Sequence, residues 1–333
     1  MSHHFNTQNL HSQPFVSIII SAYNAGKHIE QTLLSVLDQT WQSMEIIVIN
    51  DGSTDNTAVI LERYKKKGIT VLSQTNKGQD AALNFGYSNC KGDYIKFMDS
   101  DDLINPEMIS RQINILNYST DHVAYGEWGR FYNDEPSLAD FTKLDYWKDM
   151  SPLDFLTARP EGVMLQCGIM LIPRKLIEKA GLWDERLILF NDTEFFNRVI
   201  LKSKGVLFCE GARLFYRSAQ NGSISAQVTR KFFESTFLAT NLIAEQLLAL
   251  EDTYRIRNLI SNTYLNQYYR MYPHFPDLIR AHEEKIKLYG FGTVKPNGGR
   301  IFKLIKAIVG WKIASRMQAL FYKMGYKPVN NFK

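Results

Sequence analysis

The chain has 333 residues, with 39 Lys and Arg against 34 Asp and Glu, so its formal net charge is +5. A composition that is 45% hydrophobic and 22% charged is typical of a globular protein, and it excludes extensive disorder. The length predicts one large domain or two. Three widely spaced cysteines, without a Cys-x-x-Cys pair, indicate reduced thiols and argue against a disulfide framework or a zinc site.

The start of the chain, residues 1–13, lacks the basic beginning and the apolar centre of a signal peptide, and we interpret it as a disordered lead-in. No apolar run approaches the ~20 residues that a membrane-spanning helix needs. Together with the reduced cysteines, these features lead us to expect a cytoplasmic protein.

Residues 15–99 alternate short β-rich runs with helical patterns, which predicts an α/β fold with parallel strands. We expect strands over 15–20, 44–50, 69–74 and 93–99, and helices over 25–39, 53–68 and 78–90. Ser or Asp is expected to cap the helix over 53–68.

The later elements are less regular. We expect a strand over 121–132, a strand running into a helix over 162–181, a helix over 192–205, and helices between 228 and 271 that end before Pro273. The chain then divides into 14–102, 103–225, a helical extension over 226–294 and a basic tail over 295–333.

Polar clusters follow the four early strands: "SAYN" (21–24), "NDGSTD" (50–55), "QTNKG" (74–78) and "DSDD" (99–102). Open α/β sheets bind ligands beyond the carboxyl ends of their strands. We therefore expect these clusters to form one site. A nicotinamide cofactor is not expected, because no G-x-G-x-x-G loop follows any of these strands.

The three carboxylates of Asp99, Asp101 and Asp102 lie within four positions, and such neighbours repel one another. One or two of them would hold a hard divalent cation, with substrate phosphates and water as its other ligands. The alternative is that they cap the helix that begins near Pro106. Capping would explain one carboxylate, Asp102, but not three.

The turn after the second strand passes through Gly52 and presents Asp51 and Asp55. A helix cap with a turn glycine would have the same pattern. The residue types alone do not separate a ligand-binding turn from a capping turn.

At this point three blocks of sequence resemble the successive signatures of the family 2 glycosyltransferases: "VSIIISAYNAGKHIEQTLLSVLDQTWQSMEIIVINDGSTDNT", "NKGQDAALNFGYSNCKGDYIKFMDSDDLINPEMI" and "AGLWDERLILFNDTEFFNRVI". The resemblance covers residues 14 to about 225. It implies the GT-A fold, a Rossmann-like mixed sheet flanked by helices, here followed by a C-terminal helical region. It also implies an inverting enzyme that transfers a sugar from a nucleotide diphosphate sugar with Mn²⁺ or Mg²⁺.

The resemblance also implies roles in donor binding. Ser21 and Asp51 would contact the nucleotide base, with Tyr23 and Asn24 shaping the pocket. The residues Asn76, Lys77 and Gly78 would line the same side, although Asn76 and Gly78 would serve equally as turn formers.

The family's Asp-x-Asp motif matches Asp99, Ser100 and Asp101. Asp101 is then the first choice as metal ligand, and Asp99 would contact the ribose or the metal.

The family's catalytic base is an aspartate in a Glu-Asp pair, which reads Asn191-Asp192 here, so Asp192 matches the base and Asn191 departs from the pattern. Glu194 is the alternative base, and Asp192 would also suit a helix cap. Arg217 would contact the diphosphate, although the histidine that often follows it in the family is absent. An arginine at a strand edge is the structural alternative.

The tail from residue 295 onward contains nine Lys and Arg and no acidic residue. At helical spacing, Lys312, Arg316 and Lys323 share one face, while Ile313, Met317, Leu320, Phe321 and Met324 share the other. Two amphipathic helices, or one kinked at Gly310, would either contact an anionic membrane surface or pack on the protein's own body. We expect no nucleic-acid binding, because no recognised module is present.

We therefore predict a hexosyl- or N-acetylhexosaminyl-transferase that moves one sugar, most readily from a UDP-sugar, to a hydroxyl of a glycan or lipid-linked acceptor. Such an enzyme would serve polysaccharide or cell-surface glycan biosynthesis at the inner face of a membrane. The helices after residue 228 would cover the acceptor or pair two subunits. The alternatives are a non-catalytic nucleotide-sugar-binding module and a sugar nucleotidyltransferase.

Overall fold

The computed structural model describes residues 13–158, 165–218, 229–290 and 292–325. The predicted lead-in, apart from residue 13, lies outside these residues. The chain forms two compact units. The first takes in Met1–Leu156, Leu165–Glu185 and Phe195–Asn221, and the second takes in Thr157–Met164, Arg186–Glu194 and Gly222–Lys333.

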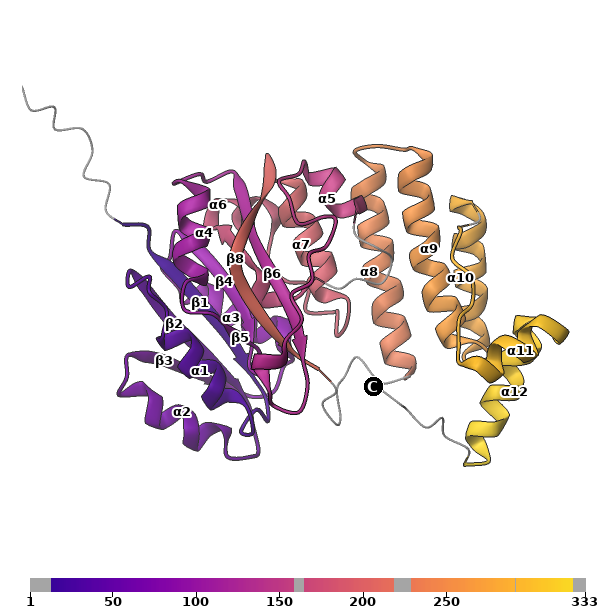
Figure 1. Cartoon of the computed structure of the whole chain (residues 1–333), viewed down its shortest axis with the longest axis horizontal. Helices are drawn as coiled ribbons and strands as arrows, with labels where there is room; N and C mark the ends of the chain where they lie inside the picture. Colours follow the sequence, from indigo (N-terminus) through magenta and orange to yellow (C-terminus); the bar gives the residue numbers. More distant parts are fainter. Residues whose placement is uncertain (1–12, 159–164, 219–228, 291, 326–333) are drawn as a thin grey trace, which may run out of the picture. The chain divides into compact units, whose positions relative to one another are not determined.

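The first unit is built on an eight-stranded sheet in the order β3-β2-β1-β4-β7-β6-β8-β5 (Figure 1). Its parallel part consists of β1 (Val16–Ala22), β2 (Met44–Asp51), β3 (Ile69–Gln74) and β4 (Tyr94–Asp99). All seven residues of β1 are buried, as expected for a central strand covered on both faces. The four predicted strands are confirmed, and none of their ends differs from the prediction by more than two residues.

The helices between these strands are α1 (Ile29–Leu37), α2 (Thr57–Lys65) and α3 (Gln79–Ser88). The helix predicted over 25–39 is confirmed as the shorter α1, on which Ile29, Leu33 and Val36 recur at helical spacing and are all buried. The predicted cap of α2 is wrong in detail. Its N-cap residue is Asn56, while Asp55 Oδ1 accepts the N–H of Thr57 at 2.9 Å, because the turn places Asp55 one residue too early to be the cap residue itself.

The rest of the sheet is formed by β5 (Leu103–Ile104), β6 (His122–Phe131), β7 (Met170–Pro173) and β8 (Gly205–Arg217). Strand β7 runs antiparallel to β4 and β6, β5 runs antiparallel to β8, and β6 and β8 are parallel. The sheet is therefore mixed, as predicted.

The connecting elements are α4 (Met108–Leu116), the 3₁₀ turn η1 (Pro136–Leu138), α5 (Pro152–Ala158), the 3₁₀ turn η2 (Cys167–Ile169), α6 (Arg174–Ala180) and α7 (Asn191–Leu201). Helix α7 ends at Leu201, earlier than predicted, because the chain turns there into β8. The cysteines Cys90, Cys167 and Cys209 are free thiols, as expected.

The second unit contains the helices α8 (Arg230–Leu248), α9 (Tyr254–Met271), α10 (Pro276–Tyr289), α11 (Arg300–Val309) and α12 (Trp311–Lys323) (Figure 1). The predicted helical stretch before Pro273 is confirmed. The tail forms two helices, because Gly310 between them has a φ of 78°. None of the helices in the described parts of the chain combines the length and the hydropathy that crossing a bilayer requires.

A buried polar network joins α8, α9 and α10. Gln267 Nε2 donates to Thr240 Oγ1 at 2.7 Å, and Gln267 Oε1 lies 3.0 Å from His282 Nε2. His282 Nδ1 lies 2.8 Å from the carbonyl oxygen of Leu278, and the neutral ring can donate to only one of these two oxygens. Burial lowers the pKa of His282 to about 4. These bonds fix how the three helices face one another, since an apolar core would tolerate other rotations.

Lys96 is fully buried in the middle of β4, which is unusual for a lysine. Its Nζ donates to the carbonyl oxygens of Gly168 at 2.7 Å and Met170 at 3.1 Å. Burial lowers its pKa from 10.5 to about 7, since the charged amine has lost its water. Lys96 thereby holds the turn η2 against the central sheet.

This burial makes stability depend on pH. Between pH 7 and 10.5 the unfolded chain carries a proton on Lys96 that the folded chain lacks, so the free energy of unfolding rises with pH in that window. The contribution is at most about 1.4 kcal/mol per pH unit. We expect Lys96→Met to flatten this rise in urea unfolding, whereas Lys179→Met, at an exposed position, keeps it. Parallel curves for wild type and Lys96→Met would contradict the burial of this amine.

Candidate functional site

The carboxyl ends of β1, β2 and β4 meet at one edge of the first unit's sheet. Ser21 of β1 is paired with Asp99 of β4 on one side and with Ile49 of β2 on the other, while Asp51 pairs with Gln74 of β3. The polar residues that follow these strands therefore come together, as the strand pattern predicts.

Asp51 holds the loop after β3 to the end of β2. Its carboxylate is almost fully buried. Its Oδ1 accepts from Gln74 Nε2 at 2.8 Å and from the N–H of Lys77 at 2.9 Å, and its Oδ2 accepts from the N–H of Gly78 at 2.9 Å. The predicted residues Asn76, Lys77 and Gly78 thus lie beside Asp51, and the side chain of Lys77 is exposed.

Asn24 ties the end of β1 to the turn after β2. Its backbone has a φ of 49°, its Oδ1 accepts from the N–H of Thr54 at 2.8 Å, and its own N–H donates to Ser53 Oγ at 3.0 Å. Tyr23, one residue earlier, leaves 52% of its surface exposed. Asn24 is therefore part of the frame of this edge, and Tyr23 is open to a ligand.

Gly52 brings two loops into backbone contact. It has a φ of +70°, and a Cβ atom there would lie 2.7 Å from the backbone nitrogen of Asn76. Only glycine fits both the left-handed conformation and this close approach. The loop over 74–78 is thus set by a glycine as well as by Asp51.

The carboxylates at the end of β4 have different partners. Asp99 accepts from Gln79 Nε2 at 2.7 Å, and burial together with the charge of Asp101 raises the pKa of Asp99.

Asp102 is fully buried. Its Oδ1 accepts the N–H of Arg217 at 2.9 Å, while its Oδ2 has no hydrogen-bond partner among the described residues. The alternative in which Asp102 caps the next helix is wrong, because Glu107 is the N-cap residue of α4.

The loop itself is fixed through its backbone. The carbonyl oxygen of Ser100 accepts from Thr32 Oγ1 of α1 at 3.0 Å. The carbonyl oxygen of Asp101 accepts from Arg217 Nε at 2.8 Å. These bonds hold the two carbonyls, so the carboxylates of Asp99 and Asp101 are held beside each other although their charges repel.

Arg217, predicted as a phosphate contact, is buried at the end of β8, with 1% of its side chain exposed. Besides the carbonyl of Asp101, its guanidinium donates to Gln31 Oε1 at 2.6 Å and pairs with the Asp134 carboxylate. It also lies over the ring of Phe131, 4.6 Å from the ring centroid. In this arrangement each guanidinium nitrogen already has a partner. Arg217 therefore stabilises the aspartate loop through its bonds to Asp101 and Asp102.

Sequence reasoning missed Gln31, Gln79 and Asp134. Asp134 and the preceding Asn133 have φ values of 59° and 55°, so they form a left-handed turn after β6. Asn-Asp is a turn signal in the sequence, but nothing local connects it to Arg217, 83 residues later.

The carboxylate oxygens of the aspartates that follow β4 suit a hard cation. The carboxylates of Asp99 and Asp101 repel each other, and the buried Oδ2 of Asp102 is without a hydrogen bond from the described part of the chain. Across the described ranges no cluster of three or more His, Cys, Asp or Glu gathers into a complete metal cage. The residues therefore fit a divalent cation that takes its remaining ligands from substrate and water.

The predicted base lies in the second unit. Asp192 stands in the first turn of α7 and is partly exposed, and its neighbour Asn191 is buried. Glu194, the alternative, is buried with 2% exposure and accepts from Gln246 Nε2 of α8 at 2.9 Å.

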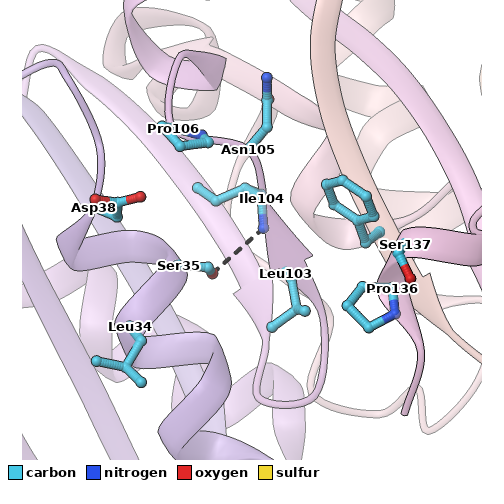
Figure 2. A pocket seen from close by; sticks show the side chains of 10 residues that line it. Leu34, Ser35, Asp38, Leu103, Ile104, Asn105, Pro106, Pro136 and Ser137 are labelled. Carbon is cyan, nitrogen blue, oxygen red and sulfur yellow. Dashed lines mark hydrogen bonds between the residues drawn. The ribbon is translucent and has the colours of Figure 1, made fainter. Parts of the chain in front are cut away.

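A hollow of about 590 Å³ lies elsewhere on the first unit. Figure 2 shows α1 on one side, with Leu34 and Ser35, and the β5 residues Leu103 and Ile104 on the other, where the N–H of Ile104 donates to Ser35 Oγ at 3.4 Å. None of the residues predicted for donor binding lines it. We do not assign it to the sheet-edge site.

We expect Gly52→Ala to lower the free energy of unfolding by about 1–3 kcal/mol more than Gly68→Ala. Both glycines have positive φ, but an added Cβ at Gly68 would meet nothing within 4 Å, so the pair separates the backbone contact from the φ strain. Urea unfolding measures the difference. Hydrogen exchange of the Lys77 and Gly78 amides should speed up in Gly52→Ala alone, and equal effects of the two changes would contradict the contact.

We expect Arg217→Lys to cost about 3 kcal/mol of stability, because a single ammonium cannot replace a buried fork that reaches three separate acceptors. Arg213→Lys is the matched control, since Arg213 is 49% exposed, pairs with Glu127 and lies over the ring of Phe141. That change should cost less than about 1 kcal/mol. Equal thermal unfolding of the two variants would show that the Arg217 bonds contribute little.

Comparison with known proteins assigns the segment that contains this sheet edge to a family. Residues 17–181 match the family described as glycosyl transferase family 2. An uncharacterised glycosyltransferase of Rickettsia typhi is 38% identical over 182 residues, which cover 54% of this chain and 56% of that protein. The chain thus spans about half the length of the curated relatives it matches.

Two solved structures share the fold. TarS 1-349 of S. aureus, in complex with UDP-GlcNAc, has a TM-score of 0.65 at 18% identity, covering 94% of this chain and 93% of that one. The mannosyltransferase PcManGT of Pyrobaculum calidifontis, in complex with GDP-Man and Mn²⁺, has a TM-score of 0.56 at 14% identity, covering 93% and 88%. With the family match, the GT-A-like mixed sheet and the relatives named as glycosyltransferases, the chain belongs to the family 2 glycosyltransferases through the domain at residues 17–181.

Proposed function

We propose that this protein is an inverting, metal-dependent glycosyltransferase that moves one sugar from a nucleotide diphosphate sugar to an acceptor hydroxyl. The observation that carries the proposal is the convergence of Ser21, Asp51, Asp99 and Asp101 at one sheet edge of a family 2 domain. Ligands of open α/β folds bind at such an edge. Ser21 and Asp51 would receive the base, and Tyr23, Asn24 and the residues Asn76, Lys77 and Gly78 would line its pocket.

The bonds of Asp51 favour uracil as the base. A carboxylate has about four acceptor positions, and three are taken by Gln74, Lys77 and Gly78. One position on Oδ2 remains, which suits the single imide N–H of uracil better than the two adjacent donors of guanine. The fold does not decide this point, because one structural neighbour was solved with UDP-GlcNAc and another with GDP-Man.

Asp101, with Asp99, would hold Mn²⁺ or Mg²⁺. When bound, the cation would neutralise the negative charge of the diphosphate leaving group. The carbonyl of Ser100 is already used by Thr32. Arg217 would act by keeping the aspartate loop in place, and its direct contact with phosphate stays a prediction.

Asp192 would take the proton of the acceptor hydroxyl. It is more suitable than Glu194, because Asp192 is partly exposed while Glu194 is buried and engaged by Gln246. A general base must reach the proton that it removes.

The acceptor would be a glycan or a lipid-linked glycan, and the transferred group a hexose or N-acetylhexosamine. We place the enzyme in the cytoplasm at the inner face of a membrane, in peripheral contact through residues 295–333 and with pairing of two subunits as a further option. The alternatives are a binding module without turnover and, less favoured, a sugar nucleotidyltransferase.

The test is a calorimetric titration of UDP, GDP and their sugars, first with Mn²⁺ and then with chelator. We expect metal-dependent binding of a uridine nucleotide, lost in Asp101→Asn and retained in Asp192→Asn. Turnover of the bound donor, including its slow hydrolysis, should fall by about 10² to 10⁴ in Asp192→Asn. Glu194→Gln is the matched control and should keep the rate.

Each alternative has its own result. Metal-dependent binding without any turnover would favour the binding module. Pyrophosphate released from a sugar phosphate and a nucleoside triphosphate would identify a nucleotidyltransferase. Failure of every nucleotide to bind would refute the donor site.

A further inference from the structure

The two helices of the tail expose an unusual amount of apolar surface. Nine large apolar side chains between residues 301 and 324 are exposed: Ile301, Leu304, Ile308, Val309, Ile313, Met317, Leu320, Phe321 and Met324. Single exposed apolar residues are ordinary, but a gathering of this size marks a surface that something covers.

On α11 the exposed apolar residues form a stripe. Ile301, Leu304 and Ile308 recur at helical spacing and are 74%, 68% and 83% exposed, whereas Phe302, more than 90° around the helix from the middle of this stripe, is buried at 7%. The helix therefore packs through Phe302 and turns its strongest apolar stripe outward.

Helix α12 has three distinct faces. Ala314 and Ser315 are buried on the first. Ile313, Met317 and Leu320 are exposed on the second, with Phe321 and Met324 beside them. Lys312 and Arg316 stand on the third. The predicted separation of cations from apolar residues is present, but the helix packs through its small residues and leaves the apolar stripe uncovered.

Trp311 anchors this arrangement at the start of α12. Its ring meets those of Tyr268, Tyr269 and Tyr272 with centroids 5.5, 4.9 and 5.0 Å away. Lys312 Nζ lies 3.6 Å from Glu283 of α10. The helix is thus fixed to α9 and α10 through its first turn, so its exposed stripe is a feature of the folded unit.

The charged residues of the tail itself have one sign. From residue 295 to the end of the chain the sequence contains nine Lys and Arg and no Asp or Glu. Arg300 and Lys303 flank the stripe of α11, and Arg316 flanks that of α12. An apolar stripe flanked on its own helix only by cations matches the boundary between acyl chains and anionic headgroups.

We infer that the outward stripes of α11 and α12 form a docking face for an anionic lipid bilayer, with the apolar side chains at the acyl boundary and the flanking cations at the headgroups. The inference deepens the membrane contact proposed above for residues 295–333 by naming the face that makes it, and it does not depend on sugar transfer. A second copy of the chain is a weaker occupant, because two such faces would bring cations against cations.

The experiment is cosedimentation of the full chain with vesicles of phosphatidylcholine mixed with phosphatidylglycerol, and with vesicles of phosphatidylcholine alone. We expect binding to the mixed vesicles that weakens with salt. The double variant Leu304→Gln with Leu320→Gln should reduce it about tenfold or more. Leu250→Gln with Leu288→Gln is the matched control, since these leucines are 61% exposed in the same unit; it should bind as wild type.

Circular dichroism and nucleotide titration of both double variants show whether each is folded, apart from any membrane effect. The inference is overturned if the folded wild type does not sediment with the mixed vesicles, or if the two double variants sediment equally. It is also overturned if light scattering shows a dimer that the Leu304 and Leu320 changes dissociate while vesicles stay unbound, since a second copy would then cover the face.

Discussion

The buried guanidinium of Arg217 is the interaction on which the sheet edge depends. Aspartates crowded after β4 would repel one another, and a charged group buried without partners is costly. Arg217 supplies a cation behind the loop, and its backbone N–H reaches Asp102, 115 residues earlier. The end of β8 and the end of β4 are therefore held together by charge as well as by the sheet. The bond from Arg217 Nε to this loop uses the backbone carbonyl of Asp101 and not its carboxylate.

Asp51 performs a similar task with backbone amides. By accepting the N–H groups of Lys77 and Gly78, it closes the loop after β3 over the end of β2. Gly52 also permits the two loops to approach, since a Cβ atom there would collide with the backbone nitrogen of Asn76. This part of the sheet edge is thus held by backbone contacts and by one carboxylate, so its shape depends on few side chains, and Tyr23 and Lys77 stay exposed.

The parallel strands could be predicted from sequence because each is a short apolar run followed by a polar cluster, and parallel order brings those clusters to one edge. The ends of helices were less predictable: α7 ends at Leu201 because the chain there turns to pair as β8, a non-local event. The partners of Arg217 could not be predicted, since Gln31 and Asp134 are 186 and 83 residues away in the chain. The Asp102 bond was missed for the same reason. The helical spacing in the tail predicts which side chains share a face. It does not predict which face packs on the rest of the second unit.

The buried amine of Lys96 also has a chemical consequence. With a pKa near 7, much of it is the neutral, nucleophilic form under mildly alkaline conditions, yet the sheet and the turn η2 seal it from solvent. An acylating reagent would reach this amine only through an opening of the central strands. Its modification would then trap the opened chain, because an acylated lysine no longer fits between the carbonyls of Gly168 and Met170. Labelling of Lys96, followed by mass spectrometry, would therefore report whether the sheet of the first unit is intact: the peptide that contains Lys96 stays unlabelled for as long as the sheet is closed.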